Sequence, residues 1–194
     1  VMHFTTNECL IENNIFKHLR HSVLLQAGSN GNVTSFNHST DPYWTNGNPL
    51  LGANSAGELV LHGNYVYANL FEQNDVQNIV IDNSHGANGP YNTFLRNRAS
   101  LYGIFFSDNT SPSQNIIGNE IPNTGFPYSA VNYSIQGNDQ FAYGNNNKGT
   151  VAPAGTSALT DISYHYLTKP DFVQDYQWGK IGLPSAMNTA KVPA

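Results

Sequence analysis

The stretch NIVIDNSHGANGPYNTFLRN, residues 78–97, contains two short strand-like segments separated by a polar turn. In the first segment, Ile79 and Ile81 alternate with Asn78, Val80 and Asp82, which is the pattern of a strand, and the segment is too short for a helix. The turn is rich in Asn, Gly and Pro, the residues that turn conformations favour. Related segments recur along the chain, so this stretch predicts the repeating unit of the fold.

An aromatic or aliphatic residue recurs at intervals of about 23 residues. This column consists of Phe16, Phe36, Phe71, Phe94, Ile117 and Phe141. A second column, two positions earlier, consists of Asn14, Thr34, Asn69, Asn92, Asn115 and Asp139. Stacked amide side chains can hydrogen-bond to their neighbours at the strand spacing of about 4.8 Å. The one long interval contains a Pro, Gly and Asn-rich stretch, about residues 38–57, which predicts a loop inserted into one repeat.

A third column consists of five-residue strands without helical segments between them. These strands are SVLLQ (22–26), ELVLH (58–62), NIVID (78–82), GIFFS (103–107) and NYSIQ (132–136). Their alternation turns one apolar face inward, with Val23, Leu25, Leu59, Leu61, Ile79, Ile81, Ile104, Phe106, Tyr133 and Ile135. One strand per repeat predicts an all-β parallel solenoid in which each repeat forms one coil and stacks on the next.

Residues 150–194 lack these columns and are rich in Pro, Tyr and Gly. Because an uncovered last coil would expose free edges and apolar residues, we expect this segment to be an irregular cap over the last coils. Tyr164, Tyr166, Phe172 and Trp178 are its expected anchors. Residues 1–149 would then form the solenoid, and their strand-like beginning favours a piece of a longer precursor.

Composition limits the classes of partner. Only 11% of the residues are charged, against roughly 25% in ordinary soluble proteins, and 27 asparagines and 17 glycines supply much of the polarity. The absence of a basic stripe argues against nucleic acid, and no apolar run approaches the ~18 residues of a membrane span. The single Cys9 excludes an internal disulfide and suits an extracellular protein built without disulfides.

Four motifs resemble right-handed parallel β-helix proteins of the pectate-lyase-like superfamily, most closely the large secreted or surface proteins of Bacteroidetes. They are RHSVLLQAGSNGNVTSFNHSTDPYWT (20–45), GELVLHGNYVYANLFEQN (57–74), QNIVIDNSHGANGPYNTFLRNRASLYGIFFSDN (77–109) and SQNIIGNEI (113–121). The tail from residue 164 resembles the segments that close such helices. This resemblance implies a single-stranded right-handed parallel β-helix of about six coils, located outside the cell or on its surface. It also implies a polysaccharide lying along the outside of one parallel sheet.

The first candidate site is the turn after residue 81. Asp82 ends its strand on the outward face, and His62 and Ser107 hold equivalent places on the adjacent coils. His85 and Asn88 follow in the turn. One interpretation is general acid–base chemistry on a sugar, with Asp82 and Asp108 roughly 5–10 Å apart as a carboxylate pair. The other is a solenoid corner, in which Asp and Asn side chains bond the turn backbone. We predict ligand contacts by His62, Asp82, His85 and Ser107.

The second candidate is a series of charges that alternates from coil to coil. It runs through Lys17 and Arg20, Glu72 and Asp75, Arg96 and Arg98, and Glu120. This pattern is typical of ion pairs between neighbouring coils. Lyases of the superfamily that the chain resembles use Arg or Lys as the base, which adds Arg98 to Asp82 and Asp108 as candidate catalytic residues.

The third candidate is the predicted loop, where Tyr43 and Trp44 either stack on a sugar ring or pack over Leu24 and Val60. The acidic residues are scattered along the chain, so no calcium cluster is visible and we expect neither a metal nor another cofactor, with calcium as the alternative. Two hypotheses for function follow. The chain is a carbohydrate-binding, adhesive or structural module, or it is the substrate-binding part of a polysaccharide lyase or glycoside hydrolase.

Overall fold

The structure, a computed structural model, describes residues 1–42, 57–122, 133–173, 178–179 and 181–182. The chain is an all-β, right-handed parallel β-helix, as predicted. One sheet stacks six strands in parallel register, and these six strands are separated by about five turns of chain. In the described residues the only helical element is the short 3-10 helix η2 (Asp171–Val173).

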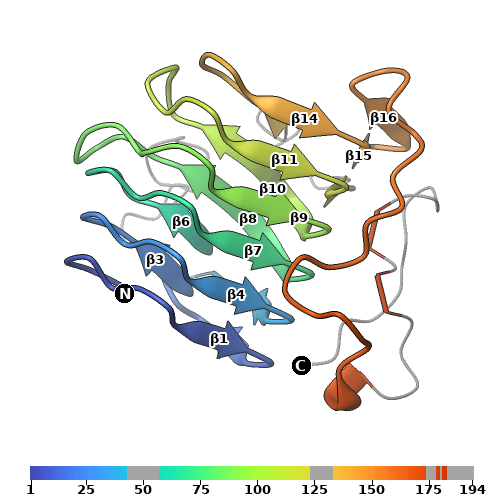
Figure 1. Cartoon of the computed structure of the whole chain (residues 1–194), viewed down its shortest axis with the longest axis horizontal. Helices are drawn as coiled ribbons and strands as arrows, with labels where there is room; N and C mark the ends of the chain where they lie inside the picture. Colours follow the sequence, from blue (N-terminus) through green and yellow to red (C-terminus); the bar gives the residue numbers. More distant parts are fainter. Residues whose placement is uncertain (43–56, 123–132, 174–177, 180, 183–194) are drawn as a thin grey trace.

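The turns stack into three parallel faces. The front sheet, which faces the reader in Figure 1, contains β1 (Leu10–Glu12), β4 (Val33–Ser35), β7 (Leu70–Glu72), β9 (Thr93–Leu95), β11 (Asn115–Ile117) and β14 (Phe141–Tyr143). The middle sheet contains β2 (Ile15–Lys17), β5 (His38–Thr40), the first residues of β8 (Asp75–Ile81) and β10 (Arg98–Phe106), β12 (Glu120–Ile121) and β15 (Asn145–Asn147). The rear sheet contains β3 (Val23–Leu25), β6 (Leu59–Leu61), the last residues of β8 and β10, and β13 (Tyr133–Ser134).

Strand β5 corrects the start of the predicted insertion. Residues 38–40 pair in parallel with β2, and His38 also pairs with Asp75 of β8, so this segment belongs to the helix itself. Residues 43–56 lie outside the described part of the chain.

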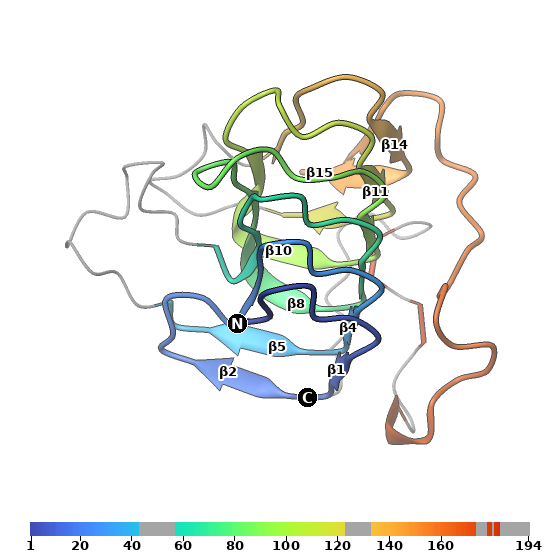
Figure 2. The same cartoon turned by 60° about the vertical axis from the view of Figure 1, so that its left-hand side comes forward.

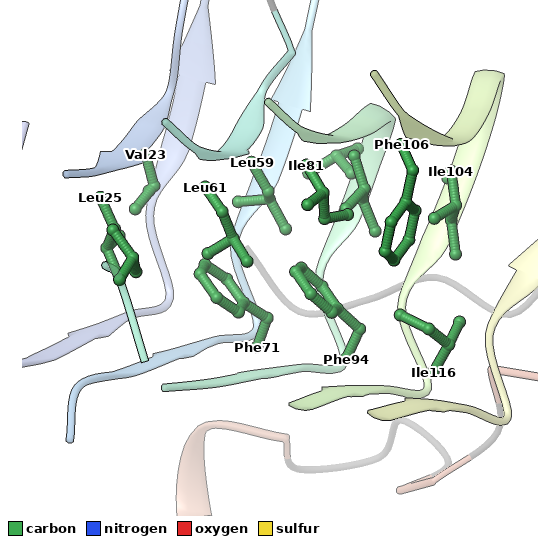
Figure 3. Packing of buried hydrophobic residues seen from close by; sticks show 14 of the residues in the cluster. Val23, Leu25, Leu59, Leu61, Phe71, Ile81, Phe94, Ile104, Phe106 and Ile116 are labelled. Atoms are coloured by element: carbon green, nitrogen blue, oxygen red, sulfur yellow. The ribbon is translucent and has the colours of Figure 1, made fainter. Parts of the chain in front are cut away.

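The interior is a continuous column of apolar side chains. Figure 3 shows side chains of the rear sheet, such as Leu61 and Ile81, facing Phe71, Phe94 and Ile116 of the front sheet. Phe71 and Phe94 lie in adjacent strands with ring centroids 4.8 Å apart and planes 7° from parallel. These vertical neighbours, 23 positions apart, confirm the predicted repeat.

The predicted aromatic column is wrong at its other members, which are Phe16, Phe36, Ile117 and Phe141. Ile116, rather than Ile117, pairs with Phe94, so Ile117 points outward. Phe141 pairs with the outward Asn115. Phe16 belongs to the middle sheet, and Phe36 occupies a corner with a left-handed backbone (φ 53°). At Ile117 and Phe141 the strands are only three residues long, and a shift of one residue turns a side chain to the other face.

Two ladders of amide side chains, buried except at the exposed Asn14, run along the helix. The first contains Asn32, Asn69, Asn92 and Gln114, and the second contains Asn14, Asn37, Asn74, Asn97, Asn119 and Asn145. In the second ladder, the backbone N–H and the side-chain amide of each asparagine donate to the Oδ1 of the next, at 2.8–3.1 Å. The predicted ladder of stacked amides is therefore present. Its members differ at Thr34, Asn115 and Asp139, which lie outside both ladders.

A left-handed residue precedes every ladder position and explains the composition. In the second corner these residues are Asn13, Phe36, Gln73, Arg96, Gly118 and Gly144, with φ between 51° and 65°. The left-handed residue turns the chain, and the following asparagine then bonds backbone groups that the turn leaves without partners. Asn97 Nδ2, for example, donates to the carbonyl of Phe71 at 2.9 Å.

The C-terminal segment descends along the side of the helix, and we call residues 157–173 the strap. After β15 the chain reverses into β16 (Thr150–Ala152), which pairs antiparallel with β15. The strap then contacts Gly118 through Leu159, and ends against Phe36 through Tyr166 and Phe172, with ring centroids 5.7 and 5.2 Å away. Figure 2 shows it running along one side of the stacked turns. Of the expected anchors, Tyr166 and Phe172 thus contact Phe36 of an early coil rather than the last coils.

The strap buries two ionisable side chains of the helix. Glu72 is fully buried and accepts hydrogen bonds from Ser163 Oγ at 2.6 Å and the N–H of Tyr164 at 2.9 Å. Arg96 is 2% exposed and donates from Nε to the carbonyl of Asp161 at 2.6 Å. Burial raises the pKa of Glu72 above 4.5, although these hydrogen bonds and the nearby His165 act in the opposite direction. Burial likewise lowers the pKa of Arg96.

We expect the stability of the docked strap to depend less on pH in Glu72→Gln than in the wild type. Because the folded pKa is raised, the folded state binds the Glu72 proton more tightly than the unfolded state does. This contribution to stability is complete below pH 4.5 and is lost as pH rises through the raised pKa. Hydrogen exchange of the Tyr164 amide between about pH 4 and pH 8, corrected for intrinsic exchange, measures it. Glu8→Gln, at an exposed site, is the control, and an unchanged slope in Glu72→Gln would contradict the argument.

Candidate functional site

The turns that leave the rear sheet form the polar corner, which we define as residues 62–68, 82–91 and 107–111. His62 follows β6, Asp82 follows β8 and Ser107 follows β10. Backbone hydrogen bonds fix this alignment, since the N–H of Asp82 donates to Leu61 and that of Ser107 donates to Ile81. The structure thus places the three side chains on successive coils, as the sequence predicted.

His62 and Asp82 are in direct contact. The Nδ1 atom of His62 lies 2.6 Å from Oδ2 of Asp82, and each side chain is a little over one-fifth exposed. The ring of His85 lies edge-on to that of His62, with centroids 4.6 Å apart. Within the described part of the chain, Nε2 of His62 carries no hydrogen bond. An imidazole whose Nδ1 is fixed by a carboxylate can present Nε2 to a ligand as a donor or acceptor.

The two acidic residues of the corner also build its turns. Asp82 accepts from the N–H and the hydroxyl of Ser84 at 2.7 and 3.0 Å. Asp108 accepts from the N–H and the hydroxyl of Thr110 at 2.9 and 2.8 Å, and also from Asn83. These are the hydrogen bonds expected if the corner is a structural turn of the solenoid. Asp108 is therefore occupied by its own turn, whereas Asp82 both closes a turn and orients an imidazole.

Ser107 and Asn88 connect neighbouring turns. The hydroxyl of Ser107 bonds the side chain of Asn83 at 3.2 Å. Asn88 is 2% exposed, accepts from the N–H of Gly63 and donates to the carbonyl of Asp82. Asn88 is structural, because its amide is buried and bonded. Ser107 is exposed, and its hydroxyl also accepts from the N–H of Asn83 at 3.2 Å.

Arg98 lies elsewhere in the helix. It begins β10 in the middle sheet, where its guanidinium lies 3.3 Å from Asp75 and 3.0 Å from Glu120 on the two adjacent coils. The predicted ion pairing between coils is present here. The three candidate catalytic residues, Asp82, Asp108 and Arg98, thus do not form one site. Arg96 and Glu72 contact the strap, and Lys17 and Arg20 are exposed.

The outer face of the rear sheet is closed to a ligand over three coils. Its outward side chains Leu24, Val60 and Val80 are only 5, 1 and 4% exposed. Tyr43 and Trp44, predicted either to stack on a sugar or to pack over this face, lie outside the described residues. The accessible polar groups therefore lie at the corner, beyond the ends of these strands.

Three tyrosines beside the polar groups were missed by the sequence analysis. Tyr65 and Tyr91 are 60 and 63% exposed, and the rings of Tyr65 and Tyr67 lie 5.5 Å apart. The N–H of Tyr65 donates to the carbonyl of Ala87, two residues after His85, so aromatic and polar groups share one surface. Gly89 allows its turn to approach Tyr67 closely, because a Cβ at Gly89 would lie only 2.9 Å from the Cβ of Tyr67. The sequence signal was the presence of aromatics at fixed distances from the turn glycines.

Metal ligands and membrane spans were also sought. Among the residues that the structure describes, no group of three or more His, Cys, Asp and Glu side chains could hold a metal ion. In the same residues, none of the helical segments has the length and apolar character needed to cross a bilayer.

Comparison with known proteins gave no relatives: neither a protein-family model, nor a curated protein, nor a solved structure matches this chain. The assignment of the fold and of the polar corner therefore rests on the structure alone.

Proposed function

We propose that the chain is a secreted or cell-surface β-helix module that binds carbohydrate at the polar corner. The observation that carries the proposal is that the exposed Tyr65 and Tyr91 belong to the same stacked turns as the contact between His62 and Asp82. Aromatic faces bind the apolar faces of sugar rings, and imidazole, carboxylate and hydroxyl groups bind their hydroxyls. The sequence resemblance to pectate-lyase-like proteins and to surface proteins of Bacteroidetes supports a location outside the cell and a polysaccharide ligand.

Retention on insoluble and immobilised polysaccharides tests this proposal. We expect Tyr65→Ala and Tyr91→Ala to weaken retention about tenfold each, because each removes an exposed stacking surface. His62→Ala should weaken it further by removing a hydrogen-bonding group. Leu167→Ala is the matched control, since this fully exposed side chain lies on the strap. No retention on any neutral or acidic polysaccharide, or equal retention by all variants, would remove the corner as a binding site.

The contact between His62 and Asp82 favours a second candidate function. A carboxylate-oriented imidazole is a general base or acid, so the corner would belong to a glycoside hydrolase or a polysaccharide lyase. Incubation with the retained polysaccharide separates the two functions. Reducing ends or unsaturated products released by the wild type and not by Asp82→Asn would establish catalysis. Retention without release would leave the module as a binding, adhesive or structural protein.

A further inference from the structure

A second accessible aromatic cluster lies on the outer face of the last two strands of the front sheet. The strap and the outer face of β11 and β14 enclose a pocket of about 260 Å³. Ile117, Phe141 and Tyr143 line it from the sheet, and Leu159, Asp161 and Tyr164 line it from the strap. Figure 1 shows the strap leaving the last turns beside these strands. The pocket therefore exists only while the strap is docked.

The walls of this pocket are aromatic and accessible. Phe141 and Tyr164 are 53 and 51% exposed. The rings of Phe141 and Tyr143 lie 7° from parallel with centroids 6.3 Å apart, because residues two apart in β14 share the outward face. A group of exposed aromatics beside a concavity with polar groups at its rim has the features of a binding surface.

The strap adds polar groups that are fixed before any ligand arrives. The Tyr164 hydroxyl donates to Oδ2 of Asp161 at 2.9 Å, and Arg96 holds the Asp161 carbonyl. Within the described chain, Oδ1 of Asp161 and the hydroxyl of Thr160 have no hydrogen-bond partner. The pocket thus offers an acceptor and a hydroxyl beside aromatic faces.

We propose that this pocket binds one neutral sugar ring, which stacks on Phe141 and donates its hydroxyls to Asp161. The proposal rests on the proposed carbohydrate-binding function and adds a second binding position to it. A uronate is disfavoured, because its carboxylate would lie against that of Asp161. An organic cation is disfavoured as well, since Asp161 offers a single carboxylate that already accepts from the Tyr164 hydroxyl.

Titration with small probes tests the pocket. The probes are the methyl glycosides of glucose, galactose, mannose, N-acetylglucosamine and galacturonate, together with tetramethylammonium, observed by ligand NMR. We expect at least one neutral glycoside to bind with Kd on the order of 1 mM. Phe141→Ala should weaken it at least tenfold, and Asp161→Asn and Tyr164→Phe should weaken it severalfold. Phe141 is half-exposed, so its replacement leaves the core intact, and Tyr164→Phe removes only a hydroxyl.

Tyr65→Ala separates this inference from the proposed function. Single-glycoside binding that is unchanged in Tyr65→Ala and weakened in Phe141→Ala supports the pocket. Polysaccharide retention that depends on Tyr65, together with glycoside binding that is absent or indifferent to Phe141, overturns the pocket and leaves the proposed function standing. Glycoside binding that depends on Phe141, without polysaccharide retention at the corner, supports the pocket and removes the corner as a binding site. Preferential binding of galacturonate or tetramethylammonium overturns the assignment to neutral sugars.

Discussion

Asn97→Ala should reduce the free energy of unfolding by about 3–5 kcal/mol, a large part of the stability of a domain of this size. Asn97 is fully buried in the second ladder. Its Nδ2 donates to the Phe71 carbonyl and to Asn119 Oδ1, and its Oδ1 accepts from the backbone and side-chain amides of Asn74. Alanine leaves the buried backbone N–H of Asn74 without its acceptor and removes one hydrogen bond each from the Phe71 carbonyl, Asn119 Oδ1 and Asn74 Nδ2, and water cannot replace these bonds without opening the corner.

Urea denaturation followed by circular dichroism measures this loss. Asn109→Ala is the matched control, because Asn109 is an exposed asparagine outside both ladders, and we expect a change within about 0.5 kcal/mol. Asn97→Asp should lie near the alanine variant, since aspartate keeps the acceptor for Asn74 but loses the donor to Phe71. Equal stability of Asn97→Ala and the wild type would mean that the ladders contribute little to the stacking of the coils.

The repeat of the helix could be predicted from sequence, and its register could not. Phe71 and Phe94 fall in two successive strands and mark the correct interval. Phe36 looks like a core residue but occupies a left-handed corner, where its ring packs under the strap. A better signal was present in the asparagines. Asn69 and Asn74 lie five positions apart, as do Asn92 and Asn97, because each three-residue front strand separates two corners.

The sequence could predict those parts of the candidate site that depend only on the alignment of successive strands. His62 and Asp82 are neighbours because each follows a strand of the same stack, so a correct strand alignment suffices to place them together. The exposure of Tyr65 depends instead on the backbone of its turn, where two consecutive residues, Asn64 and Tyr65, are left-handed (φ 57° and 62°). The pocket depends on the strap, which comes after the reversal from β15 into β16 and follows no repeat.

Arg96→Met should release the strap while leaving the helix folded. Arg96 donates to the carbonyls of Asp161 and Ile181 at 2.6 and 2.8 Å, and methionine keeps much of the buried apolar stem without these donors. The hydrogen bond from the charged group to the strap carbonyl of Asp161 is worth roughly 2 kcal/mol, which corresponds to exchange of strap amides about 30-fold faster. The Tyr164 amide, bonded to Glu72, is the reporter.

The same variant connects the strap to ligand binding. Arg20→Met, an exposed arginine replaced in the same way, is the control and should leave exchange unchanged. Amides of β7 and β9 should keep their protection in Arg96→Met, since their hydrogen bonds lie within the front sheet. Because Asp161 and Tyr164 belong to the strap, binding of methyl glycosides should fall together with strap protection, while retention at Tyr65 persists. Unchanged exchange at Tyr164 would mean that the contacts of Phe36 with Tyr166 and Phe172 hold the strap without Arg96.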